Sequence, residues 1–272
     1  MLHFQTASVN NPVFIELQHR TLKYFVSGDY TFSVCNDAKS FPDYSNFGNI
    51  DTRRAISDIC AKLNIPCVTN NNAHHARMPS AAERTADVLN VMLAAQVATR
   101  DKYMIIDSDM FPIAPFSTTK YDAYDAAVIP QIRSSAGNTV KYFWNGICYL
   151  NMDKLEPRGL LNWGEGNVEG VWTDVGGAMC GFLRNSTNAI YEMSHNISCQ
   201  WSSMDYPLDL DMAWLDYMQN DVRNVGSNFY CELYDRTFLH FRAGGNWTKG
   251  AEDVYNSNVN NLVRAVDAVC RG

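Results

Sequence analysis

The sequence predicts an α/β fold in which a single doubly wound, Rossmann-like mixed sheet is flanked by helices. Strand-like and helix-like segments alternate three times over the first hundred residues, and a fourth strand follows. That alternation is typical of parallel sheets with crossover helices. The second half has strand-like pieces separated by longer loops, so the sheet is expected to be mixed.

The first elements follow from local signals. Residues 2–9, 30–35 and 66–70 read as strands, and Asn11 followed by Pro12 predicts a helix start. Apolar spacing predicts helices over residues 51–63 and 80–98, the latter opened by the capping-box pattern at Ser80. The intervening run 70–77 is too polar for a core. Later segments are predicted as strands over residues 126–130, 142–150 and 237–241, a mobile lid over 159–170, and helices over 212–218 and 254–269.

Residues 103–106 form a short apolar run that ends at Asp107 and Asp109. Such a run is typical of a central parallel strand, and ligands bind beyond the carboxyl ends of such strands. Carboxylates are hard oxygen ligands for Mg²⁺ or Mn²⁺, so we expect a metal site there. Asp209 and Asp211 have the same spacing, but they precede an amphipathic run, which predicts an acidic helix N-terminus instead.

Composition excludes several functional classes. The 272 residues carry a net charge of −7 with scattered basic residues, which argues against nucleic-acid binding. No Gly-x-Gly-x-x-Gly follows the first strand, and no Gly-Lys-Ser/Thr phosphate loop occurs, so dinucleotide oxidoreductases and P-loop enzymes are disfavoured.

The N-terminal residues, the apolar runs and the cysteines together predict where the protein is located in the cell. The N-terminus has no basic region followed by an apolar core, and no apolar run is long enough for a membrane span. The eight cysteines contain no Cys-x-x-Cys pair, which favours reduced thiols. We therefore expect a soluble, cytoplasmic protein.

The two acids and residues 239–247, Leu-His-Phe-Arg-Ala-Gly-Gly-Asn-Trp, together resemble nucleotide-sugar glycosyltransferases of the GT-A fold. In the glycogenin-like branch, an Asp-x-Asp pair and a distant histidine in His-Phe-x-Gly-x-x-Lys-Pro-Trp bind Mn²⁺. This chain departs from that pattern, since Lys-Pro is missing before Trp247 and the nearby lysine is Lys249. The layout from the first helix, at residues 14–18, to Asn36 and Asp37 at the end of the second strand also resembles compact glycosyltransferases of bacteria and large DNA viruses. That resemblance implies the host cytoplasm if the gene is viral.

The resemblance implies transfer of a sugar from a nucleoside-diphosphate sugar, of the UDP type, to a hydroxyl of a carbohydrate or glycoconjugate. It implies Mn²⁺ or Mg²⁺ held by Asp107, Asp109 and His240, with residues 1–110 as the nucleotide-binding half and 111–272 as the acceptor-binding half. Asp174 is expected at the reacting sugars, as general base or sugar ligand. The donor nucleotide is expected at Thr6, Ala7, Ser8, Val9, Asp37, Arg84 and Ser108, the diphosphate at Gly244, Gly245, Asn246, Trp247 and Lys249, and the sugars at Trp144, Asn145, Trp172 and Gly177.

Each of these residues also has a purely structural interpretation. His240 fits a hydrogen-bonded core histidine, Asp37 a turn cap, and Arg84 an exposed arginine in the first turn of a helix. Asp174 fits a helix cap before a glycine turn, and single tryptophans usually belong to the core.

Two other functions fit part of the pattern. A Mg²⁺-dependent phosphohydrolase also has Asp-x-Asp at a strand end, but its signature normally ends the first strand and continues to Thr or Val, whereas Phe111 stands here. A non-catalytic nucleotide-sugar-binding module is the other alternative. We expect no nucleic-acid partner and no membrane-spanning segment.

Overall fold

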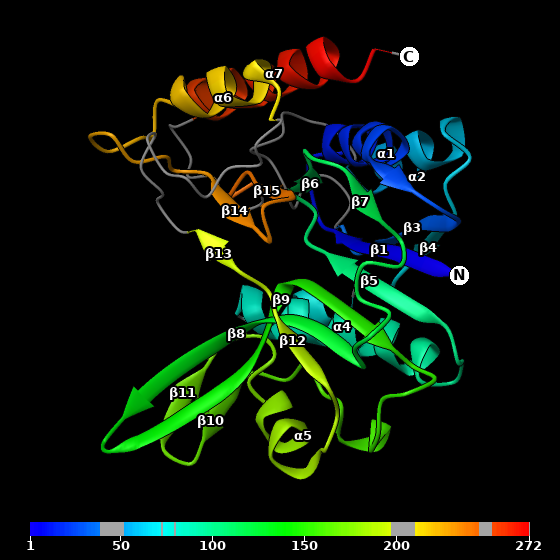
Figure 1. The fold of residues 1–272 in the computed structure, drawn as a ribbon, viewed down its shortest axis with the longest axis vertical. Coiled ribbons are helices and arrows are strands. Elements are labelled where there is room, and N and C mark those ends of the chain that lie inside the picture. Colours follow the sequence, from blue (N-terminus) through cyan, green and yellow to red (C-terminus); the bar gives the residue numbers. More distant parts are fainter. Residues whose placement is uncertain (39–51, 72, 79, 197–209, 245–251, 272) are drawn as a thin grey trace.

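The computed structural model describes residues 1–38, 52–71, 73–78, 80–196, 210–244 and 252–271. Its main sheet has seven strands in the order β12-β8-β9-β5-β1-β3-β4 (Figure 1). β9 is antiparallel to both its neighbours, and the other pairs are parallel. The prediction of an α/β fold is confirmed, because a central, mostly parallel mixed sheet is flanked by helices. The strands are β1 (Leu2–Ser8), β3 (Tyr30–Asn36), β4 (Cys67–Thr69), β5 (Lys102–Ile106), β8 (Ala126–Ser135), β9 (Asn138–Asn151) and β12 (Ile190–Glu192).

The central strand β5 is buried on both faces. Tyr103 and Ile105 belong to a core formed with helices α4 (Ala81–Gln96) and α5 (Met179–Asn185). Met104 and Ile106 belong to the opposite core, with α1 (Val13–Phe25) and α2 (Thr52–Lys62). Burial on both faces explains why this strand is continuously apolar in sequence.

A second, smaller sheet lies beyond the end of β5. It runs in the order β13-β14-β15-β6 and is antiparallel throughout. Helices α6 and α7 cover its core together with the outer face of α1 (Figure 1). β6 follows β5 after a short connection, so the two sheets meet at that connection. The elements are β6 (Met110–Pro112), β13 (His195–Asn196), β14 (Glu232–Tyr234), β15 (Phe238–His240), α6 (Met212–Gln219) and α7 (Glu252–Val269).

The remaining elements are short. β2 (Val26–Ser27) pairs with β7 (Phe116–Ser117), and α3 (His74–Arg77) precedes α4. The segment expected to form a mobile lid, residues 159–170, overlaps a 3-10 turn, η2 (Arg158–Leu160), and contains β10 (Gly166–Val168), which forms a hairpin with β11 (Val171–Thr173). The turn residues of that hairpin, Glu169 and Gly170, have positive φ angles of 54° and 81°. The lid role stays a prediction.

Two of three helix starts agree with the sequence patterns. Ser80 accepts hydrogen bonds from the backbone N–H groups of Ala82 and Glu83, which confirms the capping box. Asp211 caps α6, as expected, while Asp209 lies outside the described residues. The expected cap of α1 is wrong, because Asn11 has a φ of 42° and donates its side-chain N–H to the Tyr255 hydroxyl.

Two further expectations concern burial and cysteines. The expectation that residues 70–77 avoid the core is wrong for His74, which has an exposed fraction of 0%. Its two ring nitrogens face the carboxylates of Asp87 and Asp37 at 2.7 and 3.0 Å, and such polar partners make burial of a histidine possible. The seven described cysteines are all free thiols. No helix among the described residues has the length and apolarity needed to cross a bilayer.

Candidate functional site

A cavity of about 480 Å³ opens at the carboxyl ends of β1, β3 and β5, where ligands bind in α/β sheets. One wall comes from α4, and the others come from the loop after β11 and from β9 and β15. The cavity contains many of the predicted site residues, including Ala7, Val9, Asp37, Arg84, Asp107, Ser108, Asp109, Trp144, Asn145, Asp174 and His240.

The three predicted metal ligands converge beside this cavity. Asp107, Asp109 and His240 each offer one ligand atom, and these atoms lie within 4.8 Å of one another. Nε2 of His240 is 3.2 Å from Oδ1 of Asp109. The connection between β5 and β6 carries the two acids, and β15 pairs with β6 so that His240 stands opposite Met110. The antiparallel pairing therefore brings together residues that are far apart in sequence.

Neighbouring groups hold His240 in a defined orientation. Its Nδ1 lies 2.8 Å from Oε2 of Glu232, which stands opposite it in the pairing of β14 with β15. The Tyr234 hydroxyl donates to the same carboxylate oxygen at 2.7 Å. A histidine that donates Nδ1–H to a carboxylate presents Nε2 to a metal, which is the usual support for such a ligand.

Asp109 is held from the other side by the backbone of Gly244, whose N–H donates to Oδ2 at 2.7 Å. A Cβ on Gly244 would lie 2.6 Å from Cβ of Asp109 and 2.6 Å from the Phe14 ring. Real Cβ atoms do not make such contacts, so only glycine allows the backbone this close to the acid.

The electrostatics of this cluster favour a cation. Burial, followed by the charge of Asp109, raises the pKa of Asp107 to about 6. Burial opposes the charge on Asp109 and on His240, but their mutual attraction outweighs it. The pKa of Asp109 is therefore lowered, and that of His240 is raised to about 10 with help from Glu232.

The donor set fits a divalent metal ion. It offers two carboxylates and one imidazole, with a third carboxylate behind the imidazole. Carboxylates suit Mg²⁺ and Mn²⁺, and an imidazole ligand favours the transition metal of the two. The raised pKa of His240 reflects the surplus of negative charge around it, which a bound metal ion would also offset.

The remaining walls carry groups suited to a polar ligand. The Trp144 ring packs against Tyr234 and edge-on against His240, at centroid distances of 4.8 and 5.5 Å. Asp174 accepts from Val175 N–H at 2.9 Å and pairs with Arg133 at 3.2 Å. Asp37 also lines the cavity, and both oxygens of its carboxylate are within hydrogen-bond distance of neighbouring side chains, Asn70 and His74.

Other predicted site residues lie elsewhere in the described structure. Thr6 and Ser8 are buried, and the Ser8 hydroxyl donates to the carbonyl oxygen of Asn10. Trp172 has an exposed fraction of 63% on β11, and Gly177 is packed against Thr173, which a Cβ would meet at 1.8 Å. Their ligand roles remain predictions, and four predicted residues, Gly245, Asn246, Trp247 and Lys249, lie outside the described residues.

Sequence reasoning missed Glu232 and His75. Glu232 precedes His240 by eight residues across a strand-turn-strand segment, and this symmetry places the two side chains in one cross-strand pair. That spacing was the available signal. His75 lines the cavity, although the sequence predicts only that residues 70–77 are too polar for a core.

No family model matches this sequence, and no curated protein matches it. Among solved structures, the chain aligns with galactosyltransferase LgtC in complex with donor and acceptor sugar analogues, at 16% identity and a TM-score of 0.36. That alignment covers 56% of this chain and 58% of LgtC. Mouse xyloside xylosyltransferase 1 aligns at 9% identity and a TM-score of 0.31, covering 56% of this chain and 66% of that one.

A longer alignment, to residues 1–349 of S. aureus TarS, covers 98% of this chain and 82% of TarS. It has 10% identity and a TM-score of 0.37. All three TM-scores are below 0.5, so these similarities assign no function to this chain.

Proposed function

We propose that this protein is a metal-dependent glycosyltransferase that moves a sugar from a UDP-sugar to a hydroxyl of a carbohydrate or glycoconjugate acceptor. The observation that carries the proposal is the convergence of Asp107, Asp109 and His240 beside a cavity at the carboxyl edge of the sheet. A cation bound by these residues would face a ligand lying in the cavity. The diphosphate of a nucleotide sugar would have to lie next to that cation.

The chemistry of sugar transfer explains why these groups occur together. As the bond from the sugar to the diphosphate breaks, negative charge grows on the departing phosphate. A divalent ion bound to Asp107, Asp109 and His240 would supply Lewis-acid stabilisation of that charge. Glu232 keeps Nε2 of His240 directed at the site, and the backbone of Gly244 orients the Asp109 carboxylate.

The cavity offers a place for each part of the donor. It extends from the metal ligands toward Ala7 and Val9 at the end of β1, which is where we propose that the nucleoside lies. Arg84 stands on the α4 wall, and its Nη1 donates to the carbonyl oxygen of Met78 at 2.7 Å. Its guanidinium would place positive charge near the phosphates or the donor sugar.

Asp174 and Asn145 line the same cavity, and we propose that they contact the reacting sugars. Arg133 and the Val175 N–H already bond the two oxygens of Asp174. The lone pairs that remain on these oxygens can accept hydrogen bonds from a sugar hydroxyl. We therefore favour the role of sugar-hydroxyl ligand over that of general base.

The test is calorimetric titration of the full chain with UDP, GDP and their sugar conjugates, in Mn²⁺ and then in EDTA. We expect Mn²⁺-dependent binding of a uridine nucleotide by the wild type and by the control Asp58→Asn, whose side chain is 72% exposed on α2. Asp109→Asn and His240→Ala should each abolish that binding while still folding, with a melting temperature lowered by the loss of the buried contact between the two side chains.

Two outcomes would overturn the proposal. Absence of nucleotide binding, together with Mg²⁺-dependent release of phosphate from p-nitrophenyl phosphate, would indicate a phosphohydrolase. Tight nucleotide-sugar binding with neither transfer to any acceptor in a glycan panel nor slow hydrolysis of the donor would indicate a non-catalytic binding module.

A further inference from the structure

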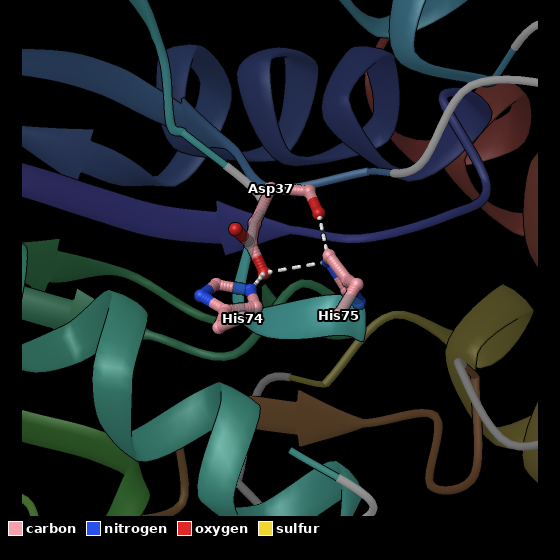
Figure 2. A group of neighbouring side chains, drawn as sticks. All are labelled: Asp37, His74 and His75. Carbon is pink, nitrogen blue, oxygen red and sulfur yellow. Dashed lines mark hydrogen bonds and ion pairs between the residues drawn. The ribbon is translucent and has the colours of Figure 1, made fainter. Parts of the chain in front are cut away.

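A second cluster of metal-binding side chains lies at the end of β3, away from the aspartates of β5. Asp37 directly follows β3, and His74 and His75 are the first residues of α3 (Figure 2). One ligand atom from each of the three residues lies within 4.8 Å of the others. Nε2 of His74 is 3.0 Å from Oδ2 of Asp37, and Nε2 of His75 is 3.3 Å from the same oxygen.

His74 faces two carboxylates at once. Its Nδ1 is 2.7 Å from Oδ2 of Asp87, while its Nε2 is 3.0 Å from Oδ2 of Asp37. A neutral imidazole has one N–H and can donate to only one of them. Since the His74 side chain is 1% exposed, water cannot compensate for the other contact. When Nδ1–H donates to Asp87, Nε2 of His74 and Oδ2 of Asp37 face each other as two acceptors, an arrangement that a metal ion between them would satisfy.

The surroundings of His74 match those of a metal ligand more closely than those of a histidine that only hydrogen-bonds to Asp37. A histidine that donates Nδ1–H to a carboxylate and directs Nε2 at a second ligand has the usual arrangement of a metal-bound imidazole. Asn70 donates to Oδ1 of Asp37 at 2.7 Å, which turns Oδ2 toward both histidines. Ligand atoms in a tetrahedral zinc site stand about 3.3 Å apart, given bonds of about 2.0–2.1 Å, close to both distances from Oδ2.

His75 adds a second imidazole to the set. Its Nε2 lies 2.7 Å from the backbone oxygen of Asp37, to which it donates, and its buried Nδ1 has no hydrogen-bond partner among the residues that the structure describes. Zinc binding through Nε2 would replace that hydrogen bond and move the ring proton to Nδ1. Asp37 and His75 both line the cavity, so an ion and a water ligand can reach the cluster from there.

We propose that Asp37, His74 and His75 bind a zinc ion at a site separate from the Asp107, Asp109 and His240 centre. Two imidazoles with one carboxylate suit zinc, whereas the oxygen-rich centre suits manganese or magnesium. The ion would connect α3 to the end of β3 and so position the segment that leads into α4.

The experiment measures zinc in the full chain after growth in zinc-supplemented medium and dialysis against a chelating resin. We expect about one zinc per wild-type chain, since a site with its supporting carboxylate retains the ion. Asp109→Asn should keep that zinc, as should the control His19→Gln on α1. His75→Gln should lose at least tenfold in zinc affinity, and Co²⁺ added to the metal-free wild type should give the visible absorption of tetrahedral cobalt.

Two results would overturn the proposal. A wild-type chain that retains no zinc and gives no tetrahedral Co²⁺ spectrum would show that Asp37, His74 and His75 form a hydrogen-bonded cluster without a metal ion. Loss of the zinc in Asp109→Asn, with retention in His75→Gln, would place the ion at the other centre. If His75→Gln does not fold, the zinc content of the wild type and of Asp109→Asn still decides the matter, and neither result depends on sugar transfer.

Discussion

Replacing Glu232 by glutamine tests whether the Glu232 carboxylate supports His240 as a metal ligand. Glu232 has an exposed fraction of 6% and bonds Nδ1 of His240 at 2.8 Å. The amide keeps an acceptor but removes the charge, and a charge-assisted hydrogen bond is about twice as strong as a neutral one. The difference is about 1–1.5 kcal/mol, which corresponds to about a tenfold loss of metal affinity and to the lower end of the range for such supporting residues.

The assay is titration of the metal-free protein with Mn²⁺, following free Mn²⁺ by electron paramagnetic resonance at fixed pH. Glu192→Gln is the matched control, because Glu192 lies exposed on β12 and its carboxylate forms an ion pair with Lys141. It should bind Mn²⁺ like the wild type. Wild-type affinity in Glu232→Gln would refute the supporting role, and a loss as complete as that of His240→Ala would make Glu232 a ligand itself.

Three further predictions concern other parts of the molecule. Gly244→Ala places a Cβ 2.6 Å from that of Asp109, so we expect weaker Mn²⁺ binding and a loss of about 1–3 kcal/mol in the free energy of unfolding, measured in urea. Ser80→Ala removes the cap of α4 and should lower that free energy by about 1 kcal/mol, and an unchanged urea midpoint would contradict this. A hydrogen bond from Cys60 lowers the pKa of Cys67 to about 7, so its alkylation by iodoacetamide should rise with pH through a midpoint near 7. Peptide mass spectrometry should find Cys67 modified first among the described cysteines, and a midpoint near 9 would contradict the hydrogen bond.

The cap of α1 shows where local patterns fail. Asparagine followed by proline is a favoured helix start, yet Asn11 donates a hydrogen bond to Tyr255 on α7, which is 244 residues away in sequence. Likewise, the polar run around His74 looked like an exposed loop. Its burial depends on Asp37 and Asp87, which belong to other elements and carry no local signal of the contact.

Predictions of the site divide in the same way. The placement of Asp107 and Asp109 at the end of a buried strand followed from a short apolar run, because β5 is buried on both faces. The position of His240 came only from a family resemblance. Glu232 was missed, since its role depends on the pairing of β14 with β15 and not on its neighbours in sequence.

The sequence by itself determined the alternation of strands and helices, the capping box at Ser80 and the two acids at the end of β5. Each of these depends on the side-chain periodicity or backbone capping of neighbouring residues, which any stretch of chain carries with it. Only the tertiary structure decided that β15 lies against β6, bringing His240 to Asp109, and that Asp37 meets the two histidines of α3. Those contacts join segments distant in sequence, and they exist because packing of the sheets and helices around shared cores fixes which strand edges and loops become neighbours.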